Sequence, residues 1–139
     1  CPELTEKLVA AIIGQQFDAI VCNIANPDMV GHSGILEAAI LAAEAVDVAI
    51  GKISTAVRSV GGCMLITADH GNLEMMRDPE TGQPHTAHTV GPVPLLYVGE
   101  RSTSLRREGA LRDVAPTLLE LLDLPQPAEM SGQSLLQPT

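Results

Sequence analysis

Two pairs of acidic and imidazole side chains stand close together in the sequence. Asp28 and His32 are four residues apart, which puts both side chains on one face if the turn after Pro27 is helical. Asp69 and His70 are adjacent in the stretch TADHGN, and on a tight turn they can point in different directions. Carboxylate oxygens and imidazole nitrogens together suit a divalent ion such as manganese or zinc better than calcium or copper(I). Metal binding is the chemistry that these pairs could support, although either pair taken alone is better explained by a structural role.

The two remaining histidines, His85 and His88, lie in the sequence PHTAHT, so the four histidines of the chain fall into three short clusters. Each cluster adjoins a predicted strand. In open α/β sheets, ligands bind at the edge formed by the carboxyl ends of the strands. Two ions held there ~3.5–4 Å apart would form a clamp for phosphoryl transfer.

Each cluster also has a purely structural interpretation. The side chain of Asp69 could cap its own turn, His70 could be a half-buried histidine with satisfied hydrogen bonds, and the segment 85–88 could be a plain loop. Taken jointly, the three clusters favour a metal site, because they use every histidine in the chain. No nucleophile accompanies them: Ser33 suits a helix N-cap, and the sequence has no G-x-S-x-G elbow and no glycine-rich phosphate loop.

The elements that must position these residues follow from hydrophobic periodicity and from Gly and Pro. Helices are predicted at residues 4–13, 34–60 and 111–122, and buried strands at 17–24, 63–67 and 93–98. Asn26–Pro27–Asp28 breaks regular structure, the loop 68–91 is long enough to be functional, and 125–139 is expected to be a surface strap. This alternation predicts one α/β domain with a mostly parallel sheet flanked by helices.

Composition narrows the class of protein. The 139 residues carry a formal net charge of −9 and 45% hydrophobic residues, with one Tyr, one Phe and no Trp. The excess of acidic residues and the lack of a basic cluster argue against nucleic acid and anionic membrane surfaces as partners. They do not argue against a phosphorylated ligand, because a bound metal ion reverses the sign of the local electrostatic field. The longest apolar stretch, 35–50, is too short and too charged to span a membrane. Three widely spaced cysteines predict free, buried thiols and a cytoplasmic location.

Five longer stretches carry a family resemblance. NIANPDMVGHSG (23–34), TADHGNLEMM (67–76), TGQPHTAHT (81–89), PVPLLYVG (92–99) and DVAPTLLELLDLPQPAEMSGQSLL (113–136) resemble the cofactor-independent phosphoglycerate mutase family. That family lies within the alkaline phosphatase superfamily. The resemblance runs nearly without gaps along the whole chain and corresponds to the carboxyl-terminal part of the family's proteins.

The resemblance implies that residues 1–139 are the C-terminal segment of a metal-binding, alkaline-phosphatase-like domain, with the N-terminal segment and an inserted transferase domain absent. It further implies an intact enzyme, expected to be monomeric, that interconverts 3-phosphoglycerate and 2-phosphoglycerate in glycolysis through a phosphoserine intermediate. The nucleophilic serine and the substrate-binding residues are expected upstream, so this chain alone is expected to be inactive.

The resemblance also implies a set of metal ligands. It assigns one divalent ion to Asp28, His32 and His88, and it assigns Asp69 and His70 to a second ion. Manganese is the first expectation, with zinc, cobalt and magnesium as alternatives. The choice of His88 rather than its neighbour three residues earlier rests on the family pattern and not on spacing.

Two other functions stay open from the sequence. The chain could belong to another phosphoester or sulfate-ester hydrolase of the same superfamily. It could also be a non-catalytic metal-binding module, for which an exposed apolar sheet edge and self-association of the isolated chain would be the expected signs.

Overall fold

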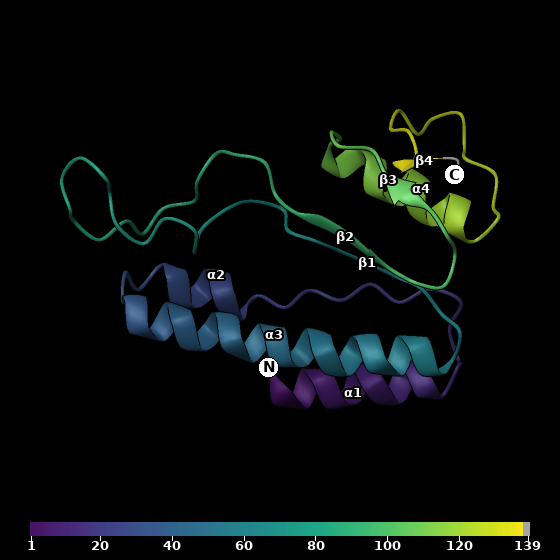
Figure 1. The fold of residues 1–139 in the computed structure, drawn as a ribbon, viewed down its shortest axis with the longest axis horizontal. Helices are drawn as coiled ribbons and strands as arrows, with labels where there is room; N and C mark the ends of the chain where they lie inside the picture. Colours follow the sequence, from purple (N-terminus) through teal and green to yellow (C-terminus); the bar gives the residue numbers. More distant parts are fainter. Residues whose placement is uncertain (138–139) are drawn as a thin grey trace.

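The computed structural model describes residues 1–137, and three helices form one of its layers. Helix α1 (Pro2–Ile13) and the short helix α2 (Asn26–Gly31) both pack on the long helix α3 (Leu36–Ser59). Figure 1 shows α1 and α2 lying along different parts of α3. The predicted helices 4–13 and 34–60 are confirmed. Helix α2 begins at Asn26, where the sequence predicted a break, because Pro27 fits the first turn of a helix.

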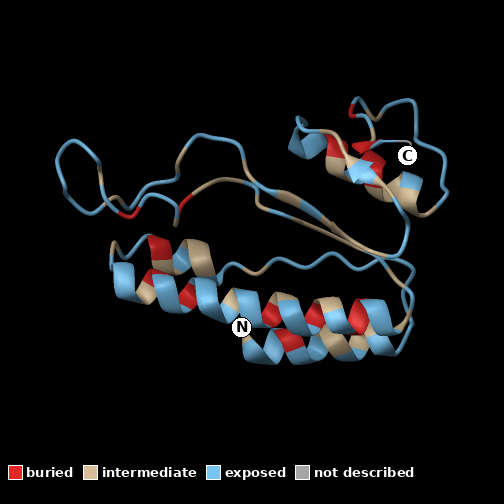
Figure 2. Cartoon of the chain, viewed as in Figure 1, coloured by how far each residue is buried: buried red, intermediate tan, exposed pale blue. Residues whose placement is uncertain are grey.

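The buried face of α3 holds this layer together. Its members lie mostly three, four or seven residues apart, on one side of the helix, and most are alanines, which let a neighbouring helix approach closely. They are Ala39, Ala42, Ala49, Ile53, Ala56 and Val57. Gly61, with φ of 67°, supplies the left-handed turn after the helix. In Figure 2, buried positions alternate with exposed ones along α3.

A hairpin of two strands lies apart from this helical layer in Figure 1. Strand β1 (Met64–Thr67) pairs antiparallel with β2 (Leu95–Val98), with Met64 opposite Val98 and Thr67 opposite Leu95. The α/β class is retained, but the expected mostly parallel sheet is not found, since both strand pairs among residues 1–137 are antiparallel. The connection 68–94 contains no crossover helix, so it returns the chain antiparallel to β1.

The C-terminal quarter forms a second small core. Helix α4 (Val114–Leu121) follows a 3-10 turn, η1 (Leu111–Asp113), and strand β3 (Ser104–Leu105) pairs with β4 (Leu136–Gln137). Pro116, Thr117, Leu135 and Leu136 are buried there. The tail is therefore more than the expected surface strap, because its two leucines fill this core.

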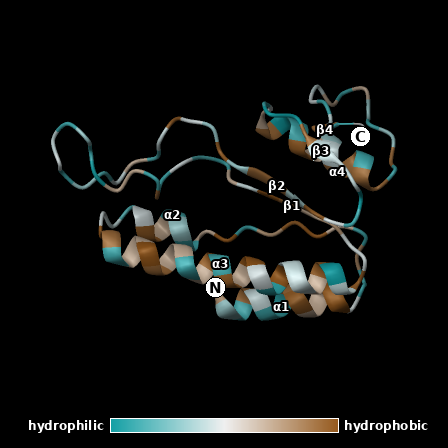
Figure 3. Cartoon of the chain, in the orientation of Figure 1, coloured by the Kyte–Doolittle hydropathy of each residue, from teal (hydrophilic) through white to brown (hydrophobic). Residues whose placement is uncertain are grey.

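The predicted buried strand 17–24 is wrong. The segment has no strand hydrogen bonding, and Phe17 and Val21 are exposed by 64% and 91%. A strand needs a hydrogen-bonded neighbour, and none of the described strands pairs with it. Figure 3 shows apolar stretches along this coil. The three cysteines are free as expected, but Cys22 and Cys63 are exposed rather than buried.

None of the helices in the described part of the chain is both long and apolar enough to cross a membrane.

Candidate metal centre

Three separate segments bring the predicted ligands together. Asp28 lies in the first turn of α2 and His32 is the residue at its C-terminal cap, so both side chains share one face, which the spacing required a helical turn to achieve. His70 and His88 lie on the two branches of the long loop 68–94. Backbone pairing of Thr89 N–H with the Gly71 carbonyl, at 3.0 Å, holds these branches side by side.

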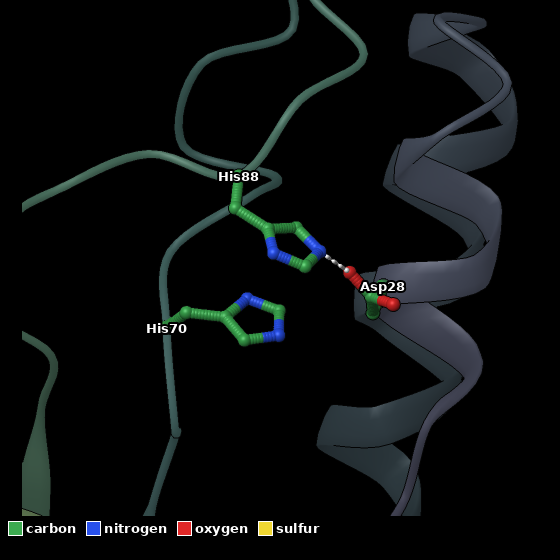
Figure 4. A group of neighbouring side chains, drawn as sticks. All are labelled: Asp28, His70 and His88. Atoms are coloured by element: carbon green, nitrogen blue, oxygen red, sulfur yellow. Dashed lines mark ion pairs between the residues drawn. The ribbon is translucent and has the colours of Figure 1, made fainter.

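Asp28, His32 and His88 form the tightest cluster. The Asp28 Oδ1 atom lies 3.2 Å from His32 Nε2 and 3.0 Å from His88 Nε2. The two Nε2 atoms lie 3.2 Å from each other. Figure 4 shows the His88 ring directed at the Asp28 carboxylate on α2. The three side chains are 36–47% exposed, so ions and ligands can reach them from solvent.

The hydrogen bond on the far side of the His32 ring fixes its tautomer. Its Nδ1 lies 2.6 Å from the Thr86 carbonyl oxygen, which can only accept, so Nδ1 carries the proton. When the ring carries only this proton, its Nε2 lone pair faces the Asp28 carboxylate and His88. A lone pair and a carboxylate oxygen then converge at one point, where a bound cation would balance them. A metal-binding histidine typically makes this kind of contact through its other nitrogen, so the residues fit a divalent ion.

Asp69 and His70 form a looser pair beside this cluster. His70 Nε2 lies 3.6 Å from Asp69 Oδ1, and its Nδ1 lies 3.3 Å from the Gly71 carbonyl oxygen, which again leaves Nε2 with the free lone pair. The His70 ring stacks on that of His88 with centroids 3.7 Å apart. One donor atom from each of Asp28, His70 and His88 also fits within 4.8 Å. The two predicted sets are therefore neighbours, and the geometry allows either His32 or His70 to share an ion with Asp28 and His88.

Asn72 is the residue of this site that sequence reasoning missed. Its side chain is buried, and Nδ2 donates to Asp28 Oδ1 at 2.8 Å. This hydrogen bond, more than the nearby His32 and His88, lowers the pKa of Asp28 and favours the carboxylate that a metal requires. Asn72 stands two positions after His70 in TADHGN, but no spacing rule distinguishes it there.

Glu74 joins the two histidine-bearing branches of the loop. Its carboxylate accepts hydrogen bonds from the Thr89 hydroxyl and, at 2.7 Å, from the Asn72 N–H. The Thr89 bond is the main reason why the pKa of Glu74 is lowered. A Cβ added at Gly71 would lie 2.0 Å from Glu74 Oε1 and 2.1 Å from Thr89 Oγ1, so only glycine fits beneath this contact.

The remaining candidates lie outside the cluster. The His85 backbone pairs with the Met76 carbonyl, and its buried Nδ1 has no hydrogen-bond partner in the described chain. Ser33 donates its hydroxyl to the Val30 carbonyl at 2.6 Å and accepts from Ile35 N–H at 3.2 Å, so it closes a local turn. The expected N-cap role of Ser33 is wrong, because α3 begins at Leu36 with Ile35 at its N-cap.

Comparison with known proteins supports a metal-binding family for this chain. The profile of the Metalloenzyme superfamily matches residues 1–126. The 2,3-bisphosphoglycerate-independent phosphoglycerate mutases of Photobacterium profundum and Thiobacillus denitrificans are 61% and 62% identical over 134 residues, which is 96% of this chain. A crystal structure of Leishmania mexicana phosphoglycerate mutase at low cobalt concentration superposes with a TM-score of 0.88 and 33% identity, over 99% of this chain and 28% of that one.

The chain spans 26% of the length of the two bacterial relatives. The matches confirm the family resemblance found in the five motifs and the α/β class of the fold. This chain therefore belongs to the Metalloenzyme superfamily, and the relatives that it matches within that superfamily are 2,3-bisphosphoglycerate-independent phosphoglycerate mutases.

Proposed function

We propose that this chain is the metal-binding, C-terminal part of a glycolytic phosphoglycerate mutase that interconverts 3-phosphoglycerate and 2-phosphoglycerate through a phosphoserine. The observation that carries the proposal is the meeting of Asp28, His32 and His88 from separate segments, with three donor atoms 3.0–3.2 Å apart. The high identity to mutases over 96% of the chain supports the same reaction. The cytoplasm is the compartment proposed for it.

Asp28, His32 and His88 would hold one divalent ion, and Asp69 and His70 would contribute to a second. Manganese is the proposed metal, with zinc, cobalt or magnesium able to use the same oxygen and nitrogen donors. Bound ions of this kind supply a positive field for a transferring phosphoryl group and lower the pKa of a hydroxyl nucleophile.

The chain's own residues keep the donor atoms ready for that role. The Thr86 carbonyl holds the His32 ring in the tautomer with a free Nε2. Asn72 keeps Asp28 ionised by donating a hydrogen bond to it. The serine that accepts the phosphoryl group and the groups that bind the glycerate are proposed to lie outside these 139 residues.

A chimera tests the reaction. Residues 4–137 replace the corresponding segment of the Photobacterium profundum mutase, to which this chain is 61% identical. The chimera should interconvert the two phosphoglycerates, and the same chimera with Asp28→Ala should lose that activity. A folded chimera that hydrolyses phosphate esters without mutase activity would instead favour a superfamily hydrolase.

The isolated chain should not interconvert the phosphoglycerates, because a phosphoryl acceptor is missing from its site. An assay of the purified chain with Mn²⁺ and 3-phosphoglycerate checks this. Substantial formation of 2-phosphoglycerate would contradict the proposal that the serine lies elsewhere.

Elemental analysis of variants tests the assignment of ligands to two ions. Asp28→Ala should remove one ion and leave the other, whereas Asp69→Ala should have the complementary effect. Because elemental analysis counts ions without identifying their sites, double variants decide between the two groupings that the geometry allows. His70→Ala should remove no further metal in the Asp69→Ala background, but it should remove the remaining ion in the Asp28→Ala background. If His70→Ala removed the same ion as Asp28→Ala, the alternative set of Asp28, His70 and His88 would be correct.

A further inference from the structure

Asn72 occupies a position between the two arms of the proposed metal centre. It follows His70 by two residues, yet its side chain reaches across to α2 and is 7% exposed. Nδ2 donates to Asp28 Oδ1 at 2.8 Å and lies 3.4 Å from the Asp28 carbonyl oxygen. Asn72 is therefore the direct link between the loop that carries His70 and the helix that carries Asp28.

The bonded oxygen is the same one that faces the histidines. Asp28 Oδ1 accepts from Asn72 and lies within 3.2 Å of the Nε2 atoms of His32 and His88. A carboxylate oxygen can accept more than one partner, so the Asn72 bond occupies one direction and leaves another open toward the imidazoles. This contact fixes the rotation of the carboxylate before any ion arrives.

The Asn72 carboxamide is itself held in place. A Cβ added at Gly31 would lie 2.1 Å from Asn72 Oδ1, so the amide packs directly on the backbone of α2. This Oδ1 is buried without a hydrogen-bond partner among the described residues. The backbone N–H of Asn72 is bonded to Glu74 at 2.7 Å. A buried amide oxygen without a hydrogen-bond partner lowers the free energy of unfolding. The same buried position allows the amide nitrogen to donate its hydrogen bond to Asp28.

We propose that Asn72 is a positioning residue of the metal centre: it orients Asp28 for the divalent ion and sets the distance between α2 and the His70 arm. This inference rests on the proposed metal function, which it deepens. Partners of metal-binding carboxylates that lie outside the ligand set typically change affinity by 10–100-fold when they are removed.

Titration of the purified chain with Mn²⁺ alone tests the proposal. Asn72→Ala should weaken Mn²⁺ affinity by ~10–100-fold, while Asn23→Ala, at an exposed asparagine outside the site, should match the wild type. With Co²⁺ alone as the probe, Asn72→Ala should also change the visible absorption of the bound ion, because Asp28 would approach it differently. Wild-type affinity and an unchanged spectrum in a folded Asn72→Ala chain would overturn the proposal.

Gly31→Ala provides a second variant that keeps Asn72 but displaces its amide. It should weaken Mn²⁺ affinity in the wild type and have little further effect in the Asn72→Ala background. Circular dichroism shows whether Asn72→Ala folds. If it does not, Gly31→Ala alone is the test, and an unchanged Mn²⁺ affinity of Gly31→Ala would overturn the proposal. Failure of the wild type itself to bind Mn²⁺ would contradict the proposed function as well, so the two failures are distinguishable.

Discussion

The Asp28 carboxylate is the point at which the polar contacts of the site meet. It has Asn72 on one side and the Nε2 atoms of His32 and His88 on the other. The hydrogen bond from Asn72 is the main reason why its pKa is lowered, so it is ionised at neutral pH. Since the Thr86 carbonyl holds the proton of His32 on Nδ1, the site presents lone pairs inward.

His88 and His85 form a natural pair of test positions, because they are three residues apart on the same loop. His88→Ala should lower Mn²⁺ affinity by at least the ~10–100-fold typical when an outer partner is lost, because it removes a proposed ligand atom. His85→Ala should leave affinity unchanged, since its ring lies outside the cluster. Isothermal titration with Mn²⁺ measures both. Equal losses of Mn²⁺ affinity in the two variants would contradict the assignment of His88, rather than His85, as the ligand.

At the scale of elements, the site depends on contacts that tie loop branches and helix ends together. Glu74 and Thr89 join the branch of His70 to that of His88. A second tie lies far from the metal centre: Asp113, beside α4, accepts from Ala110 N–H and Gln133 N–H at 2.8 Å each. The Thr117 hydroxyl donates to the Asp113 carbonyl and accepts from Leu135 N–H, which anchors the C-terminal strand.

Thr89→Val removes the hydroxyl of the loop tie while keeping the shape of the side chain. We expect the free energy of unfolding to fall by ~0.5–1 kcal/mol, because the bond to Glu74 is exposed to solvent. Urea denaturation measures the loss. The same substitution in a Glu74→Ala background should cost much less, and an equal cost in both backgrounds would mean that the tie contributes nothing to stability.

Asp113 gives the C-terminal core a predictable pH dependence. Backbone hydrogen bonds from Gln133 and Ala110 hold its pKa below the ordinary 3.8, so the unfolded chain takes up this proton at a higher pH than the folded one. The contribution of the ionised Asp113 side chain to stability is thus complete at neutral pH. It is lost as the pH falls below 3.8 and through the lower pKa that Asp113 has in the folded chain.

The isosteric variant Asp113→Asn isolates this contribution. Wild type should be more stable than Asp113→Asn at neutral pH, and the difference should shrink as the solution is acidified through that range. Urea midpoints of both proteins across pH provide the measurement. A difference that stays constant down to the acid limit would exclude Asp113 as the source.

The whole molecule exposes more surface than its mass predicts. Its accessible surface is 9425 Å², whereas a compact monomer of 14.6 kDa is expected to expose roughly 6,900 Å². Large apolar side chains contribute to the excess, among them Phe17, Val21 and Leu96. Exposed apolar surface on this scale favours association with other protein chains or packing against further segments of a longer chain.

Self-association of the isolated chain is the expected consequence. Val21→Asp should weaken it, because Val21 is 91% exposed and apolar. Asn23→Asp adds the same charge two residues away without removing an apolar side chain, so it should have a smaller effect. Sedimentation velocity over a range of concentrations compares them. A wild-type chain that stays monomeric throughout would contradict this prediction.

The sequence by itself determined the features that depend on local pattern. Helical periodicity predicted α1 and α3. The spacing of Asp28 and His32 allowed a shared face if their turn were helical, although the sequence predicted a break there. The hydrophobic runs at β1 and β2 were also sufficient to place both strands. Three clusters that together use every histidine favoured a metal site over structural roles, in line with the superfamily match.

Only the tertiary structure decided which distant residues meet. The direction of the β1–β2 pair depends on how the chain returns through the loop 68–94, and the state of the segment 17–24 depends on whether a strand lies beside it. The link between Asn72 and Asp28 spans 44 positions, and no local pattern encodes a hydrogen bond across that separation. Hydrophobic periodicity shows which face of a helix or strand is buried. Strand pairing and side-chain contacts depend instead on which distant segment the folded chain brings against that face.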